Sequence, residues 1–400
     1  AISAIDFVKV ADLNRDCVDD IIFSKFQQGN TFTALLSNRD GTFQISKTFI
    51  ASSTNLSALN IGDVDANGSI DIASISSQFL SNGNVDVFLN SAKSTCSCQA
   101  SSSSGSPACS LNFGTTKAYQ NANTLKLLSA DVNNDSIPDL ISCTGGDFDG
   151  TKSSNNIIVR LGNNTGNLST ITSSVPDGAN NIITGYFDDD NNLDLAVRNY
   201  MNPTVSIYTG DGIGKFNFSK TIFLPFQSYG EIIASGDFDG DGKTDIALAE
   251  YSSSTTNNFY VLSSKDSFTN PVKYDSGVQI INLASGDFNG DSKTDIVVVG
   301  GAGAVAGIPI NKLSIFLNNG SGVFNSPTLY FSGIEPYNIA TADLDNDGKS
   351  DIVATNYPYR SNDIGGQVYA YLSSNDFASS NGNQSFYFGN RNLSKVVLKD

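Results

Sequence analysis

The sequence contains no histidine and no tryptophan, and Met201 is its only methionine. Histidine is the commonest general base near neutral pH and a frequent zinc ligand, so the usual side chain of hydrolytic and zinc-dependent catalysis is missing. Glutamate is also scarce, because only Glu231, Glu250 and Glu335 occur. These absences favour a binding or structural function over a catalytic one.

Basic residues are few: 23 Lys and Arg stand against 40 acidic residues, which gives a net charge of −17. No basic stripe is present to neutralise phosphates, so a nucleic-acid partner is not expected. The chain has no apolar run of about 18 residues, and we therefore expect no membrane span within it. No basic-then-apolar leader begins at Ala1, and we expect that a signal peptide has been removed.

Five cysteines leave one without a partner if the others pair. Cys96, Cys98 and Cys109 cluster in a serine-rich stretch, 94–110, where a bridge from Cys96 or Cys98 to Cys109 would close a short loop. Their spacing fits no zinc pattern, so a disulfide is the favoured interpretation. Cys17 and Cys143 are expected to be thiols that are buried or distant from each other.

Aspartate is concentrated in a nine-residue motif. Its fullest copy, Asp237–Asp245 (DFDGDGKTD), places carboxylates at positions 1, 3, 5 and 9 and is followed by an apolar run. Carboxylate oxygens crowded in a tight loop call for a hard cation, and Ca²⁺ suits best because it takes six to eight oxygen ligands. An EF-hand is excluded, because position 12 is Leu248 instead of glutamate and the flanking segments are strands. Further copies begin at Asp12, Asp63, Asp131, Asp287 and Asp343, and a damaged copy begins at Tyr186.

Each copy lies in a repeat with the same order of segments. An apolar segment precedes the loop, a second follows it, an alternating third segment comes next, and a glycine turn ending in an aromatic leads to a fourth, as in Gly212–Phe216. Four strands per repeat without a helical period indicate antiparallel sheets, and seven such units predict a seven-bladed all-β propeller. We expect one domain over 1–400. Its repeats are approximately 5–55, 56–122, 123–178, 179–228, 229–278, 279–333 and 334–400.

The loop, the apolar strand after it and the Leu-x-Asn-x-Gly-x-Gly-x-Phe segment that follows resemble the FG-GAP/VCBS repeats. Such repeats build the seven-bladed head of the integrin α subunit and many secreted propellers. The resemblance covers all seven repeats. It implies that each loop joins the first and second strands of a blade and binds Ca²⁺ through side chains at positions 1, 3, 5 and 9 and the carbonyl at position 7.

The resemblance therefore implies about six Ca²⁺ sites, with a weak seventh at Asp188–Asp194, where Tyr186 replaces the first ligand. Cys17 and Ser136 stand at position 6, where glycine is favoured, and should strain their loops. The role expected for the ions is structural, because protein ligands nearly fill the coordination shell. The candidate ligands are Asp12, Asn14, Asp16, Asp20, Asp63, Asp65, Asn67, Asp71, Asp131, Asn133, Asp135, Asp139, Asp188, Asp190, Asp194, Asp237, Asp239, Asp241, Lys243, Asp245, Asp287, Asn289, Asp291, Lys293, Asp295, Asp343, Asp345, Asp347, Lys349 and Asp351.

Function in propellers usually resides on the face away from such loops. Tyrosines beside Arg, Asn and Glu in those connections are candidates for stacking on sugars or for a protein-binding patch, although Asn-Tyr segments also suit packing between blades. The missing tryptophan argues mildly against a sugar-stacking lectin. The candidate ligand-binding residues are Tyr200, Tyr229, Tyr251, Tyr337, Tyr357, Tyr359 and Arg360.

Two classes of function remain open. The first is a secreted or cell-surface recognition or adhesion module that binds a glycan or a protein. One variant of this hypothesis makes the module a subunit of an extracellular assembly. Millimolar extracellular Ca²⁺ and sequons such as Asn217-Phe-Ser agree with that location. The alternative is a polysaccharide lyase of propeller form, in which Tyr with Arg or Lys beside Ca²⁺ abstracts a proton next to a uronate carboxylate. The oligomeric state is left open.

Overall fold

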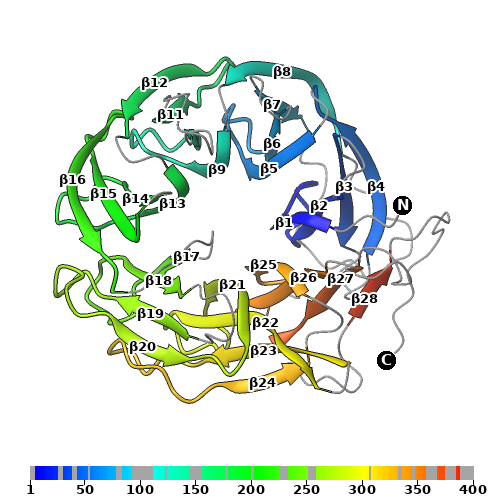
Figure 1. Ribbon diagram of the computed structural model, residues 1–400. Coiled ribbons are helices and arrows are strands. Elements are labelled where there is room, and N and C mark those ends of the chain that lie inside the picture. Colours follow the sequence, from blue (N-terminus) through cyan, green and yellow to red (C-terminus); the bar gives the residue numbers. More distant parts are fainter. Residues whose placement is uncertain are drawn as a thin grey trace.

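The computed structural model contains seven four-stranded antiparallel sheets arranged in a ring (Figure 1). It describes residues 5–25, 30–37, 43–52, 55–77, 83–91, 111–121, 124–144, 155–175, 179–199, 202–225, 233–250, 258–305, 308–331, 336–344, 347–356, 367–373 and 384–387. No α-helix occurs within these ranges, and none of their residues forms a helix able to span a membrane. The predicted seven-bladed all-β propeller is confirmed.

The blades follow one another along the chain. Blade one comprises β1 (Ile5–Ala11), β2 (Asp20–Lys25), β3 (Thr31–Ser37) and β4 (Phe43–Ile50), and blade two comprises β5 (Asn55–Gly62), β6 (Asp71–Ser77), β7 (Gly83–Asn90) and β8 (Phe113–Asn121). Blade three comprises β9 (Thr124–Ala130), β10 (Asp139–Thr144), β11 (Asn156–Leu161) and β12 (Ser169–Ser174), and blade four comprises β13 (Ala179–Gly185), β14 (Asp194–Asn199), β15 (Thr204–Gly210) and β16 (Phe216–Phe223).

The remaining three blades have the same composition. Blade five comprises β17 (Ile233–Gly236), β18 (Asp245–Ala249), β19 (Asn258–Leu262) and β20 (Val272–Asp275), and blade six comprises β21 (Gln279–Gly286), β22 (Asp295–Val305), β23 (Ile308–Phe316) and β24 (Thr328–Phe331). Blade seven comprises β25 (Pro336–Ala342), β26 (Asp351–Asn356), β27 (Gln367–Tyr371) and β28 (Gln384–Tyr387).

Within every blade the spatial order of the strands is their order in the sequence. The first strand lies nearest the centre of the ring and the fourth lies at its rim (Figure 1). Each blade is therefore made from one continuous stretch of chain, and the ring closes by packing of blade seven on blade one. Val8 and Phe23 share a buried cluster there with Leu344 and Val353.

The core consists of seven buried clusters, one between each pair of neighbouring blades. Between blades four and five, for example, Ala196 and Ile207 pack with Ile246 and Leu248. Second strands are covered on both faces, so β14 and β18 are buried along their whole length. This explains why second strands read as continuous apolar runs without alternation.

The blades approach one another most closely where the first strand ends. A Cβ atom on Gly185 would lie 2.6 Å from Cγ2 of Thr244, and one on Gly236 would lie 2.6 Å from Cγ2 of Thr294. Each threonine belongs to the next blade, just before its second strand. Only a small residue fits at this point, because real Cβ atoms do not come that near to a packed side chain.

Candidate metal centres

Each acidic motif forms the connection between the first and second strands of its blade. Its position 9 is the first residue of the second strand in all seven blades, as Asp245 is of β18. This agrees with the placement that the FG-GAP resemblance implies. Because the first strands occupy equivalent places around the ring, the seven connections lie on the same face of the propeller (Figure 1).

The aspartate at position 1 fixes the shape of the loop. In loop five, Oδ1 of Asp237 accepts the backbone N–H of Asp241 (3.2 Å) and Oδ2 accepts that of Gly242 (2.9 Å). The same two hydrogen bonds, from the N–H groups at positions 5 and 6, occur in the five other loops that begin with aspartate. The carboxylate thus folds the loop around itself, and its remaining lone pairs stay available to a cation.

Position 6 has a left-handed backbone in every loop. Glycine occupies it in three loops, including Gly242 (φ 84°), but Cys17 (φ 67°), Ser136 (φ 67°), Asn191 (φ 62°) and Ser292 (φ 63°) occupy it in the others. The strain predicted at Cys17 and Ser136 is confirmed by these angles, since residues with a Cβ rarely adopt them. Position 4 is left-handed as well in five loops, a feature that sequence reasoning missed. Those residues are Arg15, Ala66, Asn134, Gly240 and Gly290.

The aspartate at position 9 is buried in all seven blades, with at most 1% of its surface exposed. Asp245 Oδ2 accepts the N–H of Phe238 at position 2 (2.9 Å), and Oδ1 accepts the N–H of Ser264, just beyond the third strand (2.8 Å). Every blade repeats this pair of bonds. Position 9 therefore joins the loop to the end of the third strand, independently of any ligand.

Burial raises the pKa of these carboxyl groups, while the backbone N–H donors oppose the rise. The pKa of Asp20 is raised to about 8 and that of Asp71 to about 7. The pKa of each of Asp139, Asp194, Asp245 and Asp295 is raised to about 6. Nearby aspartates of the same loop add to the rise, so a cation among them would favour the ionised form.

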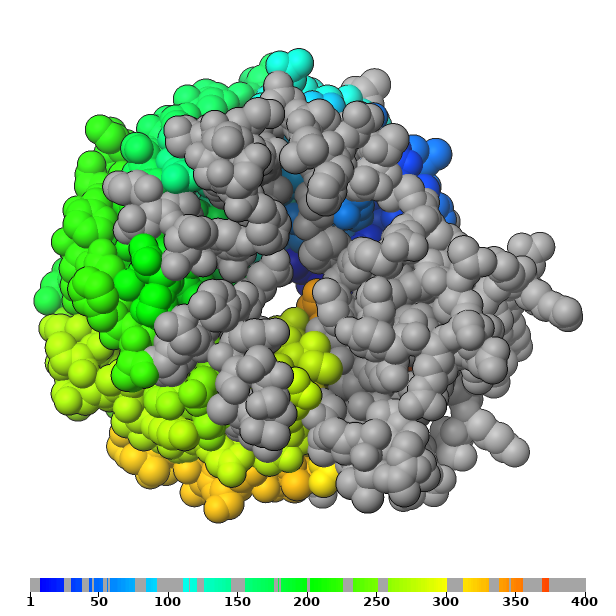
Figure 2. Space-filling model, viewed as in Figure 1, coloured from blue at the N-terminus to red at the C-terminus, as the bar shows by residue number. Residues whose placement is uncertain are grey.

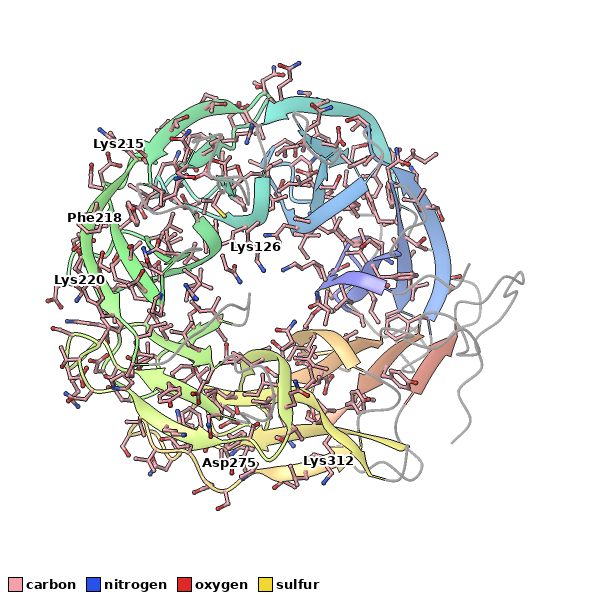
Figure 3. The ribbon with its side chains drawn as sticks, viewed as in Figure 1. Lys126, Lys215, Phe218, Lys220, Asp275 and Lys312 are labelled. Atoms are coloured by element: carbon pink, nitrogen blue, oxygen red, sulfur yellow. The ribbon has the colours of Figure 1, made fainter. Side chains whose placement is uncertain are left out.

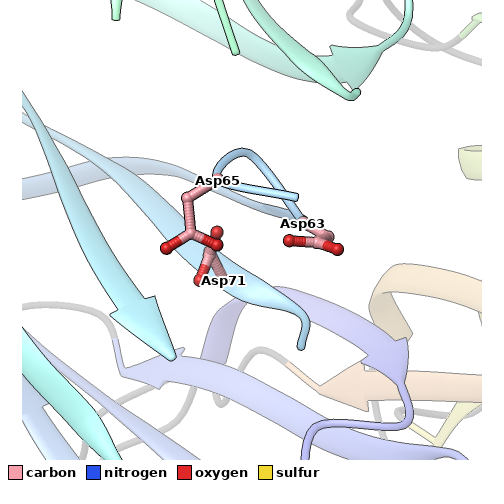
Figure 4. A group of neighbouring side chains, drawn as sticks. All are labelled: Asp63, Asp65 and Asp71. Atoms are coloured by element: carbon pink, nitrogen blue, oxygen red, sulfur yellow. The ribbon is translucent and has the colours of Figure 1, made fainter. Parts of the chain in front are cut away.

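Three loops bring carboxylates close enough to share one ion. Oxygens of Asp63, Asp65 and Asp71 lie within 4.8 Å of one another in loop two (Figure 4). The same holds for Asp188, Asp190 and Asp194 in loop four, and for Asp237, Asp239 and Asp241 in loop five. An all-oxygen set of this kind suits a hard divalent cation, so the residues present fit a metal ion.

The predicted ligand sets are assembled only in part. In loop five the buried Asp245 lies outside the group that its three sister carboxylates form. Loops one, three and six carry asparagine at position 3, and Asp345 of loop seven falls outside the described residues. Loop four, predicted to be the weakest because Tyr186 replaces its first aspartate, does gather its three carboxylates.

Loop four is also tied directly to loop five. The N–H of Thr244 donates to the carbonyl oxygen of Tyr186 (2.9 Å), and the N–H of Tyr186 donates to the hydroxyl of Thr244 (2.9 Å). Lys243 at position 7 forms an ion pair with Asp189 (2.7 Å). Neighbouring protein groups thus hold loop four at the place where its first carboxylate is missing.

The candidate ligand-binding residues of the opposite face are hardly covered by the structure. Tyr337 lies in β25 and the other six, Tyr200, Tyr229, Tyr251, Tyr357, Tyr359 and Arg360, lie outside the described residues. Their neighbour Arg198 is only 1% exposed, and its guanidinium donates to the carbonyl oxygen of Asn202 (2.8 Å). This arginine braces the hairpin between β14 and β15 and is not presented to a ligand.

The expectation for Cys17 was wrong, because Cys17 is disulfide-bonded. Position 6 is the exposed apex of the loop, which makes the sulfur accessible to a partner, and that partner lies outside the described residues. Cys143 on β10 is a buried free thiol, as predicted. The three candidates Cys96, Cys98 and Cys109 also lie outside the described residues.

The fold and the seven acidic loops define a repeat-built β-propeller with candidate metal loops on one face. The sequence model of the FG-GAP-like repeat family matches residues 186–248, 237–298 and 287–354, each match running from one acidic loop into the second strand of the next blade. Residues 186–354 are therefore FG-GAP-like repeats, and they form part of a seven-bladed β-propeller.

Solved structures share this fold at low sequence identity. The crystal structure of BBS1N in complex with ARL6DN matches with a TM-score of 0.57 at 8% identity, covering 89% of this chain and 94% of that chain. The crystal structure of a protein from Lactobacillus plantarum matches with a TM-score of 0.55 at 12% identity, covering 89% and 93%. Among curated protein sequences, none matches the chain significantly.

Proposed function

We propose that the protein is a secreted or cell-surface recognition propeller, stabilised by Ca²⁺, which binds a glycan or a protein on the face opposite its acidic loops. The observation that carries this proposal is the contrast between the two faces. The first-to-second-strand loops all have the same length, and in all seven the aspartate at position 9 accepts the same pair of backbone N–H bonds. The second-to-third-strand connections range from 306–307 between β22 and β23 to 145–155 between β10 and β11.

A constant loop on a repeated scaffold serves the scaffold, whereas variable connections are where binding specificity is usually built. The variable connections also hold most of the candidate tyrosines, among them Tyr200, Tyr251 and Tyr357. Tyrosine beside polar residues suits contact with sugars or with a protein surface. A binding role, as a separate protein or as a subunit of an extracellular assembly, therefore fits better than a catalytic one in a chain without histidine.

The proposed role of Ca²⁺ is to stabilise the loop face. Asp237, Asp239 and Asp241 would hold the ion in loop five, with equivalent residues in the other loops. Their negative charges repel one another in the metal-free chain, and a divalent cation offsets that repulsion. Since the ligands come from a loop already folded by its own N–H bonds, the ion stabilises the blade by mass action.

A glycan array and a cell-surface binding assay, each run with Ca²⁺ and with EDTA, test the function. Two groups of variants are compared: Tyr200→Ala and Tyr357→Ala on the proposed binding face, and Asp241→Ala on the loop face. We expect the tyrosine variants to lose binding at unchanged Tm. Asp241→Ala should lower Tm yet retain binding below its melting transition.

The opposite pattern would place the ligand on the loop face and overturn the proposal. Polymers of uronic acids that bind should also be assayed for unsaturated products. Their appearance would show a lyase and contradict a purely binding function.

A further inference from the structure

Two lysines stand on inner strands of the ring. Lys9 lies in β1 and Lys126 lies in β9, with β5 of blade two between them in the ring. Lys126 points into the central opening (Figure 3), which remains open in the space-filling view (Figure 2). Burial, and next the charge of Lys126, lower the pKa of Lys9 to about 8.

Neither lysine has a counter-charge within the part of the chain that the structure describes. Both ion pairs found there involve other lysines, and no hydrogen bond there uses either ammonium group. Asp6 is the only acidic residue in the seven inner strands, and its side chain is not among those described. The other polar side chains described on the inner strands include the amides of Asn60 and Asn282, which donate to the carbonyl oxygen of Leu127 and to Oδ1 of Asn338 in the neighbouring blades.

This arrangement is unfavourable on its own. Two like charges in a confined, partly desolvated space repel each other more strongly than they would in water. The chain has no shortage of carboxylates, yet most are gathered in the loops, while the exposed Lys215 and the half-buried Lys220 stand at the outer rim (Figure 3). A narrow cavity with charges of one sign focuses the potential and attracts ions of the other sign.

We propose that the central channel binds a small divalent anion, of the phosphate or dicarboxylate class, between the ammonium groups of Lys9 and Lys126. Two ammonium groups on separate strands match an anion whose charge is shared by several oxygens, and each contributes a charge-assisted hydrogen bond. This site is independent of the acidic loops and of any ligand on the opposite face.

Isothermal titration calorimetry on the full chain in Ca²⁺-containing buffer tests the proposal, with sodium sulfate and sodium succinate as probes. Both probes carry two negative charges, and their relative affinity distinguishes a phosphate-like ligand from a dicarboxylate. The variants are Lys9→Met and Lys126→Met, which keep the length of the side chain, and the matched control is Lys215→Met. We expect each channel variant to weaken binding by about tenfold or more, and the control to bind like the wild type.

A second measurement uses the unmodified chain and does not depend on the folding of any variant. Lysines are acetylated by a brief pulse of reagent, with and without anion at matched ionic strength, and the sites are quantified by mass spectrometry. We expect sulfate or succinate to slow acetylation of Lys9 and Lys126 but not of Lys215. Equal rates with and without anion at all three sites, or unchanged affinity in both channel variants, would overturn the proposal.

Discussion

The carboxylate of Asp245 accepts the backbone N–H of Ser264 at 2.8 Å, which fastens the acidic loop of blade five to the end of its third strand. The equivalent bond in blade six joins Asp295 to the N–H of Asn318 at 2.7 Å. Position 9 is thus a structural residue as well as a candidate ligand. The other acidic residues of loop five, Asp237, Asp239 and Asp241, are exposed or half-buried, so their contribution can be tested separately from that of Asp245.

Asp245→Asn should destabilise blade five whether or not Ca²⁺ is present. The substitution replaces one carboxylate oxygen by an NH₂ group, which cannot accept a hydrogen bond, so one of the two backbone N–H donors loses its acceptor at a fully buried site. Leaving a buried donor without an acceptor costs about 1–3 kcal/mol. Urea unfolding in EDTA and in Ca²⁺ measures the loss, and an unchanged midpoint in EDTA would contradict the structural role.

Asp241→Ala provides the complementary case. Asp241 is exposed, and we expect its loss to change the Tm little in EDTA. In Ca²⁺ the variant should melt below the wild type, because a site that holds its ion at a hundredfold excess over Kd stabilises the fold by about 2.7 kcal/mol. Thermal melts of both proteins over a Ca²⁺ titration measure this difference. Equal Tm values at saturating Ca²⁺ would show that loop five does not depend on the ion.

The metal-free protein should be more stable near pH 5 than near pH 8. Burial raises the pKa of Asp20 to about 8, of Asp71 to about 7 and of Asp245 to about 6, whereas an unfolded aspartate ionises near about pH 4. Between these values the folded chain holds protons that the unfolded chain has released. Raising the pH through this window therefore lowers the free energy of unfolding.

Calcium should reverse part of that trend, because it binds the ionised carboxylates and displaces their protons. Calorimetric melts in EDTA and in Ca²⁺ across this pH range give both slopes. The stabilisation by Ca²⁺, taken at each pH as the Tm in Ca²⁺ minus the Tm in EDTA, should grow with pH. A metal-free Tm that rises from pH 5 to pH 8 would contradict the burial of these carboxyl groups.

The fold was predictable because its signal recurs. Aspartates at positions 1, 5 and 9 mark one register in loop after loop, and the apolar run after Asp245 marks a second strand buried on both faces. The left-handed backbone at position 4 was hidden, since Gly240 suggests it but Arg15 and Ala66 do not. No local pattern reveals that Asp245 reaches Ser264, because that contact exists only once the third strand is in place.

Contacts between residues far apart in the sequence likewise leave no local pattern from which they could be predicted. Lys9 and Lys126 belong to different repeats, and only the closure of the ring turns their strands toward a common channel. Cys17 was expected to be a thiol because position 6 was considered for its backbone alone. Its exposure at the loop apex is a property of the folded blade.

Thiol mapping should distinguish Cys17 from Cys143. Alkylation of the denatured, unreduced protein is expected to label Cys143, which is a free thiol, and to leave Cys17 unlabelled, because Cys17 is disulfide-bonded. Peptide mass spectrometry without reduction then identifies the peptide linked to Cys17. Labelling of Cys17 before reduction would contradict the disulfide, and lack of labelling at Cys143 would contradict its free state.

Gly185→Ala should loosen the contact between blades four and five. The new methyl group would lie 2.6 Å from Cγ2 of Thr244 and 2.8 Å from the ring of Phe187, so the blades must separate slightly or the side chains must move. Overpacking of this kind costs about 1–3 kcal/mol. Gly114→Ala in β8 is the matched control, since the nearest neighbour of its Cβ would be the carbonyl oxygen of Leu89 at 4.0 Å. Chemical denaturation of both variants should show a loss of stability for Gly185→Ala alone, and equal effects would mean that the inner rim tolerates a larger residue.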